Sequence, residues 1–188
     1  MKKLLMLAAA CLCLWSVPGG AQLRPDPIEL NIPNIEQERN TWCWAALAQQ
    51  VLVSRTYGSP PSQCELVTIS NIKLGHSELD CCQNQTDPVC DRFGDQRDSI
   101  GLVTQYGGQA RQVPLPSPEE IYNYLVAGSP LIIIFQRTED AKHAYLVRGL
   151  SWVGDEARLL INDPAGRDSQ TVNYDLVRPS WADAIVIE

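Results

Sequence analysis

The sequence predicts an α+β fold, with helices in the first half of the chain and an antiparallel β-sheet in the second half. From Trp44 onward, apolar residues recur at i, i+3, i+4, i+7 and i+8, which is the stripe of a helix packed against a core. After residue 130 the pattern changes to short runs rich in β-branched residues, which indicates strands. These patterns do not give the order of the strands.

Four helices are expected, and the last has the strongest start signal. Ser117-Pro118-Glu119-Glu120 places serine at the N-cap, proline at the first position and glutamate at the third. Asn40 or Thr41 can cap the first helix, so that Cys43 falls in its first turn. The expected helices run from this start to Tyr57, and over Gln63–Ile72, Asp98–Tyr106 and Pro118–Ala127.

Five strands are expected, all in the second half of the chain. The apolar run at Leu131–Phe135 is typical of a buried strand. The proline-containing stretch 22–33 is expected to be an extended arm on the surface. The expected strands are Leu131–Phe135, His143–Leu150, Ala157–Asn162, Gln170–Tyr174 and Ala184–Ile187.

The N-terminus has the pattern of a bacterial secretory signal peptide. Lys2 and Lys3 precede an apolar run, and small residues stand before a cleavage site expected after Ala21. The apolar run is too short to span a bilayer. A lipoprotein processed before Cys11 is the less favoured alternative, because Leu7 stands one place too far from that cysteine. We therefore expect residues 1–21 to be a signal peptide, residues 22–188 to be one domain, and the protein to be secreted or periplasmic.

Charge limits the classes of partner. The formal net charge of −7 becomes −9 when the signal peptide and its two lysines are removed. An acidic chain disfavours nucleic acid and anionic membranes as partners. We expect a monomer that acts on a peptide or protein, with no membrane span and no cofactor.

Five cysteines remain after cleavage, and four of them form a cluster between residues 64 and 90. An odd number in an exported protein implies one free thiol or an intermolecular bridge, and the simplest interpretation is two disulfides within the cluster and a free Cys43. Two disulfide patterns stay open: Cys64–Cys81 with Cys82–Cys90, or Cys64–Cys82 with Cys81–Cys90. Zinc is disfavoured because no paired C-x₂-C spacing is present, and His76 is expected on an exposed loop.

Cys43 also has the surroundings of a reactive thiol. The free N–H groups and the dipole at a helix N-terminus stabilise a thiolate. His143 opens an expected strand, and Asp163 follows the end of the next one. If these strands form a hairpin, His143 and Asp163 are neighbours at one edge of the sheet, as a base and its orienting carboxylate must be. A buried structural cysteine, a surface histidine and a turn aspartate are the individual alternatives.

Together these residues resemble the papain-like cysteine proteases. The resemblance rests on Gln37, Trp42-Cys43-Trp44-Ala45, Lys142-His143-Ala144 and Ile161-Asn162-Asp163-Pro164. It is closest to the compact bacterial branch, which includes secreted effector proteases and the leader-peptide peptidases of bacteriocin exporters. The resemblance implies Cys43 as nucleophile, His143 as base, Asp163 as the group that orients the imidazole, and Gln37 as oxyanion donor.

The sequence departs from papain in three ways. Asp163 stands where papain has asparagine, and Thr41-Trp42 replaces the Gly-Ser before the papain cysteine. Too few residues separate Ala21 from Cys43 for papain's inhibitory propeptide. The expected activity is hydrolysis of peptide bonds. Acyl transfer or transglutamination with the same triad is one alternative, and a non-catalytic binding module with this fold is another.

Overall fold

The computed structural model describes residues 24–55, 59–136 and 142–188. The expected signal peptide, the expected end of the first helix and the turn before His143 lie outside these residues. The helices are α1 (Cys43–Arg55), α2 (Gln63–Leu74), α3 (Gln96–Gln105), α4 (Pro118–Val126) and α5 (Tyr174–Val177), with a 3₁₀ turn at Arg178–Ser180. The strands are β1 (Ile28–Glu29), β2 (Ala110–Val113), β3 (Leu131–Gln136), β4 (Lys142–Val153), β5 (Glu156–Asn162), β6 (Ser169–Asn173) and β7 (Trp181–Ile187).

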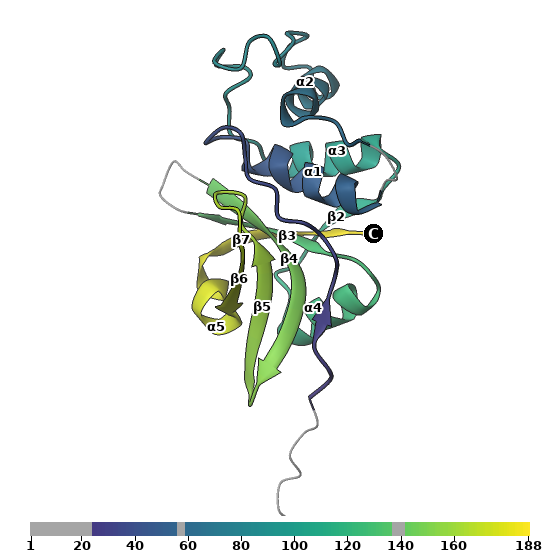
Figure 1. The fold of residues 1–188 in the computed structure, drawn as a ribbon, viewed down its shortest axis with the longest axis vertical. Helices are drawn as coiled ribbons and strands as arrows, with labels where there is room; N and C mark the ends of the chain where they lie inside the picture. Colours follow the sequence, from purple (N-terminus) through teal and green to yellow (C-terminus); the bar gives the residue numbers. More distant parts are fainter. Residues whose placement is uncertain (1–23, 56–58, 137–141) are drawn as a thin grey trace, which may run out of the picture.

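An antiparallel sheet is the centre of the fold, with the strand order β2-β7-β3-β4-β5-β6. Strand β4 is the longest, and it pairs with β3 through its first half and with β5 through its second half. The short strand β1 pairs with β4 beyond the end of β3, where Ile28 faces Leu150. The arm that contains β1 then passes α1, as the purple segment in Figure 1 shows. The expected α+β class is confirmed.

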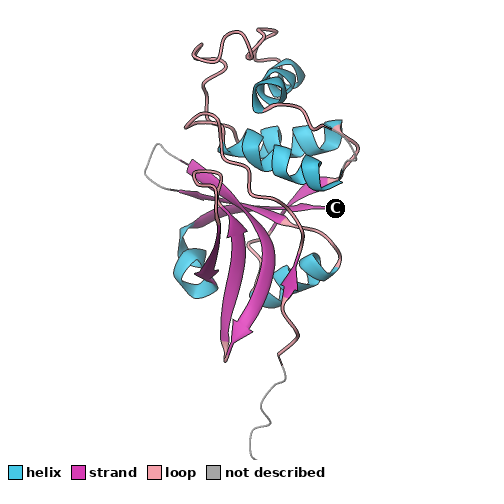
Figure 2. Cartoon of the chain, viewed as in Figure 1, coloured by secondary structure: helices cyan, strands magenta, loops and turns pink. Residues whose placement is uncertain are grey.

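Helices cover both faces of the sheet (Figures 1 and 2), and the sequence of β3 explains why. Ile132 and Ile134 face the core beneath α1, α2 and α3. Leu131 and Ile133 point to the opposite core, which α4 covers. Successive side chains of a strand point to opposite faces, so an unbroken apolar run is buried on both.

Helix α1 lies in the middle of the helical layer and packs against α2, α3 and β4. Nine of its thirteen residues are buried, which accounts for its apolar character on nearly all sides. Gln50 is the only polar residue among those nine. Helix α1 therefore joins the helical layer to the strand that carries His143.

Some elements differ from the expectation in extent. Helix α3 begins at Gln96 because Asp95 caps it, accepting from the Arg97 N–H, while the Asp98 carboxylate accepts from the Asp95 N–H. Strands β1 and β2 were not expected, because they are short and only one of their residues, Val113, is buried. Helix α4 has the expected capping box at Ser117.

Two disulfides hold the loop after α2. The structure has Cys64–Cys82 and Cys81–Cys90, the second of the two patterns that the sequence left open. Cys43 is the free cysteine of the described residues. None of the helices in the described ranges is long and apolar enough to cross a membrane.

Candidate active site

Cys43 is the first residue of α1, and its side chain is nearly buried. The residue before it, Trp42, is fully buried and donates from its indole Nε1 to the Cys90 carbonyl at 2.8 Å. The Thr41 hydroxyl donates to the Asp91 carboxylate at 2.5 Å, so this side chain binds a neighbouring loop. The start of α1 is therefore fixed by the segment that follows the disulfide cysteine Cys90.

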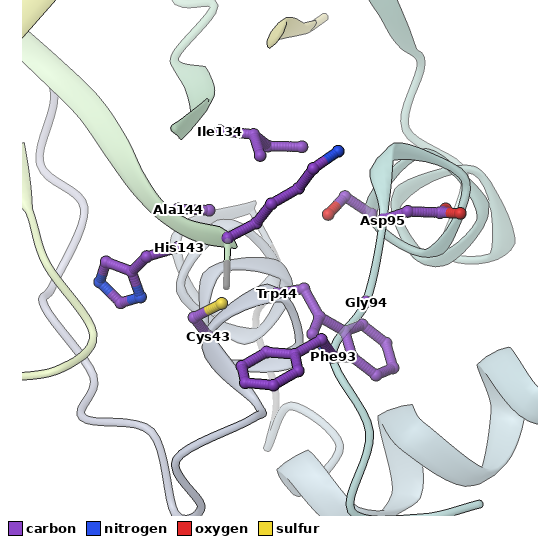
Figure 3. Close-up of a pocket in the computed structure, with 10 residues that line it drawn as sticks. Cys43, Trp44, Phe93, Gly94, Asp95, Ile134, His143 and Ala144 are labelled. Atoms are coloured by element: carbon purple, nitrogen blue, oxygen red, sulfur yellow. The ribbon is translucent and has the colours of Figure 1, made fainter. Parts of the chain in front are cut away.

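His143 lies beside Cys43, as Figure 3 shows, and it comes from the start of β4. Its Nε2 is 2.7 Å from the Asp163 Oδ1, and the Cys43 side chain lies next to the ring, close enough to interact with it. The ring of Phe135 packs edge-on against the imidazole, with centroids 5.4 Å apart. Only 5% of the His143 surface is exposed, so these three side chains fix the plane of the ring.

The surroundings of His143 favour the imidazolium. Burial by itself lowers the pKa of His143, because a charged ring loses hydration. Hydrogen bonds and charge interactions with Asp163 and Cys43 outweigh burial and raise the pKa of His143 to about 9. The structure therefore describes a histidine that holds its proton at neutral pH.

Asp163 directly follows β5, and the β4–β5 hairpin brings it to His143. In this hairpin Leu146 pairs with Asn162, so the start of β4 and the end of β5 lie at the same edge. The Asp163 Oδ1 also accepts from the Ala165 N–H at 2.9 Å, which is the local bond of an Asx-type turn. One carboxylate thus closes the turn and binds the imidazole.

Gln37 lies beside the loop that carries Asp163. Its backbone N–H donates to the Pro164 carbonyl at 2.8 Å. Its side-chain Nε2 donates one hydrogen to the Arg39 carbonyl at 2.8 Å, which fixes the amide plane and leaves the second amide hydrogen for another acceptor. His76, the other histidine of the sequence, lies on the exposed loop after α2.

A pocket opens next to Cys43, and Figure 3 shows the side chains that line it. Its inner wall is apolar and comes from Trp44, Ile134 and Ala144. The outer wall is the segment Phe93–Asp95, which sequence reasoning did not place at the site. The lining residues are Cys43, Trp44, Phe93, Gly94, Asp95, Ser99, Ile134, Lys142, His143 and Ala144.

Close packing on Trp44 explains how the segment Phe93–Asp95 is held. A Cβ atom on Gly94 would lie 2.4 Å from the Trp44 ring, so glycine allows the backbone to approach the indole. The Arg92 guanidinium stacks over the same indole, 5.0 Å from its centroid. Gly94 lies four residues after the disulfide cysteine Cys90, and no pattern in the sequence indicates which side chain it contacts.

The described residues contain no group of three histidine, cysteine, aspartate or glutamate side chains that could hold a metal ion. What the geometry offers is nucleophilic chemistry. A thiol stands at a helix N-terminus, a protonated imidazole contacts it, and a carboxylate holds the other ring nitrogen.

Comparisons with known proteins agree with this fold. The chain aligns with the peptidase domain of Streptococcus ComA, a bifunctional ABC transporter of a quorum-sensing pathway, at 18% identity and a TM-score of 0.59, covering 83% of this chain and 97% of that one. A double-glycine-motif protease from an AMS/PCAT transporter, solved with its leader peptide, gives 16% identity and a TM-score of 0.54 over 87% and 98% of the two chains.

Procathepsin L 3 from the larval midgut of Tenebrio molitor is also similar, with 10% identity and a TM-score of 0.54 over 90% of this chain and 72% of that one. These likenesses show a shared papain-like fold. No curated protein matches the sequence. The model of the Peptidase C39-like family matches residues 29–184, and the chain therefore belongs to this family of cysteine peptidases.

Proposed function

We propose that this protein is an exported cysteine peptidase in which Cys43, His143 and Asp163 form the catalytic triad and Gln37 completes the oxyanion hole. One observation carries the proposal. His143 forms a hydrogen bond with Asp163 at 2.7 Å through Nε2, and the same ring lies against Cys43 at the start of α1. A buried structural cysteine, a surface histidine and a turn aspartate are separate explanations of the three residues. They do not account for the contacts that link them.

The proposed reaction begins with attack of the Cys43 sulfur on the carbonyl carbon of a peptide bond. The negative charge that develops on the carbonyl oxygen is stabilised by the Cys43 N–H, which has no acceptor within its helix, and by the second amide hydrogen of Gln37. The imidazolium of His143 gives its proton to the leaving amine. Water then attacks the thioester, His143 takes a proton from that water, and the acid leaves.

The pocket beside Cys43 indicates the kind of peptide that fits. Trp44, Ile134 and Ala144 form an apolar inner wall, while Asp95 and Lys142 bring opposite charges to its rim. A substrate side chain whose first carbon atoms are apolar would pack against this inner wall. The transporter protease solved with its leader peptide supports a peptide as the substrate class.

Export is proposed from the pattern of residues 1–21, and the two disulfides support it because such bonds persist in oxidising compartments. The secreted or periplasmic protein would then be residues 22–188, acting as one peptidase domain and as a monomer. N-terminal sequencing of the protein recovered from the periplasm or medium tests cleavage after Ala21. Size-exclusion chromatography with light scattering tests the monomer.

Activity tests the triad. Purified residues 22–188 should hydrolyse a pool of fluorogenic peptides, and Cys43→Ala and His143→Ala should each abolish hydrolysis while far-UV circular dichroism stays unchanged. His76→Ala is the matched control, because it removes the other histidine of the mature chain and should leave the rate unchanged. Transfer to an added amine in place of hydrolysis would favour an acyltransferase. Equal losses in His76→Ala and His143→Ala would contradict the triad.

A further inference from the structure

A single buried amide on α1 connects the segments that carry the proposed catalytic groups. Gln50 is fully buried and lies seven residues after Cys43, two helical turns along the same face of α1. The other buried residues of α1 are apolar, so an amide at this position must find its hydrogen bonds in the elements packed against α1.

Each hydrogen-bonding group of the Gln50 side chain has a partner. Its Nε2 donates to the Asn34 Oδ1 and to the Ile35 carbonyl, both at 3.0 Å. Its Oε1 accepts from the Asn162 Nδ2 at 3.1 Å. These bonds reach two different parts of the chain: the segment that leads to Gln37, and the last residue of β5.

Asn162 links Gln50 to Asp163, because it binds the Gln50 amide and directly precedes Asp163 in the chain. Asn162 is fully buried, and its Nδ2 also donates to the Ile32 carbonyl at 3.1 Å. Its Oδ1 accepts from the Arg148 Nε at 2.9 Å and from the Ser169 hydroxyl at 2.7 Å. Hydrogen bonds at both Nδ2 and Oδ1 therefore fix the position of Asn162. Because Asp163 is the next residue in the chain, they also restrict the position of Asp163.

Asn34 holds the other side of the same loop. Its Nδ2 donates to the carbonyls of Asp163 and Gly166, at 3.2 and 3.0 Å. Its Oδ1 receives the hydrogen bond from Gln50. The loop that presents the Asp163 carboxylate is thus bonded to α1 along two routes that meet at Gln50, one through Asn162 and one through Asn34.

We propose that Gln50 is a positioning residue, which sets the Asp163 loop against α1 and thereby keeps His143 aligned with Cys43. The inference rests on the triad of the proposed function and adds a residue that contacts neither substrate nor the reacting atoms. A leucine or methionine would fill the same volume, but it would leave Asn34, the Ile35 carbonyl and Asn162 without this hydrogen-bond partner. The amide is explained by the three segments that it joins.

The Gln50 amide affects the position of the Asp163 loop relative to α1. Without the Gln50 amide, Asn162 and Asn34 each lose a buried partner, and both regain hydrogen bonds only if water enters or the loop moves. A shift of the loop changes the 2.7 Å contact between Asp163 and His143. Misplacement of a catalytic group by about 1 Å can reduce a rate about 100-fold.

The experiment compares Gln50→Met with Gln63→Met in the full mature chain. Gln63 is a matched control because it is also buried, and its amide is likewise satisfied: it accepts from the Glu38 N–H and donates to the Glu36 carbonyl and the Gln49 side chain. Those bonds reach the same arm, but none of them reaches Asn162 or Asp163. Both variants lose a buried amide, so both should lose stability.

The readout is the rate at which iodoacetamide alkylates Cys43, measured from pH 4 to pH 11. Alkylation forms no oxyanion, so the profile reports the cysteine and its imidazole and is independent of Gln37. Gln50→Met should reduce the rate at pH 6 about 10- to 100-fold, the usual size of an effect on a supporting contact. It should also move the alkaline limb of the profile to lower pH and reduce kcat more than KM changes. Gln63→Met should keep the wild-type profile.

Identical profiles for the two variants, at equal loss of stability, would overturn the inference and leave the triad intact. Slow alkylation of the wild-type protein at pH 6, as for an ordinary thiol, would instead overturn the proposed function. If Gln50→Met does not fold, Asn34→Ala replaces it, because Asn34 is only half-buried. That variant should show a smaller change in the same direction, and an unchanged profile would again refute the role of Gln50.

Discussion

Asp163→Asn tests the charge of the proposed triad separately from its geometry. Asparagine has the same shape, and its carbonyl oxygen can still accept a hydrogen bond from the His143 ring. The substitution removes the negative charge that lies 2.7 Å from Nε2. The substitution therefore measures how much the charge of Asp163, separately from the orientation of the ring, raises the pKa of His143.

The structure sets the size and sign of the effect. Burial lowers the pKa of His143, and the hydrogen bonds and charges of Asp163 and Cys43 raise it to about 9. A hydrogen bond to a charged group contributes roughly 1.5–3 kcal/mol and a neutral one roughly 0.5–1.5 kcal/mol. Replacing the first by the second therefore loses about 1–1.5 kcal/mol, and since 1.36 kcal/mol corresponds to one pH unit, the titration moves by about one pH unit. In Asp163→Asn the pKa of His143 should therefore fall below its wild-type value by about one pH unit, because the neutral amide opposes the effect of burial less than the carboxylate does.

Nuclear magnetic resonance of ¹⁵N-histidine measures this directly, since the sequence has only two histidines and His76→Gln assigns them. Asp95→Asn is the matched control: Asp95 lies on the pocket rim, and asparagine can replace it as the cap of α3. That control should leave the pKa of His143 near 9. Hydrolysis by Asp163→Asn should fall less than in Asp163→Ala, which loses orientation as well. An unchanged titration in Asp163→Asn would refute the reasoning.

Three further outcomes are expected. Gln37→Ala should lower kcat by roughly 10²–10³, or about 2.7–4 kcal/mol, and leave alkylation of Cys43 unchanged, because only hydrolysis forms an oxyanion; equal losses in both assays would argue against an oxyanion role. Gly94→Ala should clearly lower kcat/KM and change the melting temperature only slightly, because the added Cβ would overlap the Trp44 ring and shift the pocket wall. Replacing both cysteines of the Cys64–Cys82 bridge by serine should cost about 3 kcal/mol in a denaturant titration, as expected for its 18-residue separation, with activity retained.

The sequence was most informative where local rules act alone. The Ser117 capping box fixed the start of α4, and the apolar run at Leu131–Ile134 required a strand buried on both faces. The proximity of His143 and Asp163 was also predictable, because a hairpin between two recognisable strands leaves few alternatives. Each of these predictions needed only short-range pattern or one pairing of neighbouring strands.

Long-range pairing was not predictable in this way. Strand β2 reads Ala110-Arg111-Gln112-Val113, a polar stretch that becomes a strand because β7 offers it an edge. No sequence pattern distinguishes Gln50 from other glutamines in helices, because its partners come from segments 15 to 112 residues away. The disulfide pattern stayed open for the same reason: sequence spacing does not give the distance between Cys64 and either member of the Cys81-Cys82 pair.

The segment from Cys90 to Asp95 shows that the disulfide loop and the site are not separate parts of the molecule. In the sequence, the disulfide cysteines form a cluster that is separate from Cys43. In the structure the Cys90 carbonyl receives the Trp42 indole N–H, and Asp91 binds Thr41, so both contacts fall within the two residues before Cys43. The two bridges then differ in consequence. Cys64–Cys82 holds α2, whereas the buried Cys81–Cys90 bridge anchors one wall of the pocket and the start of α1, so its loss should affect both stability and activity.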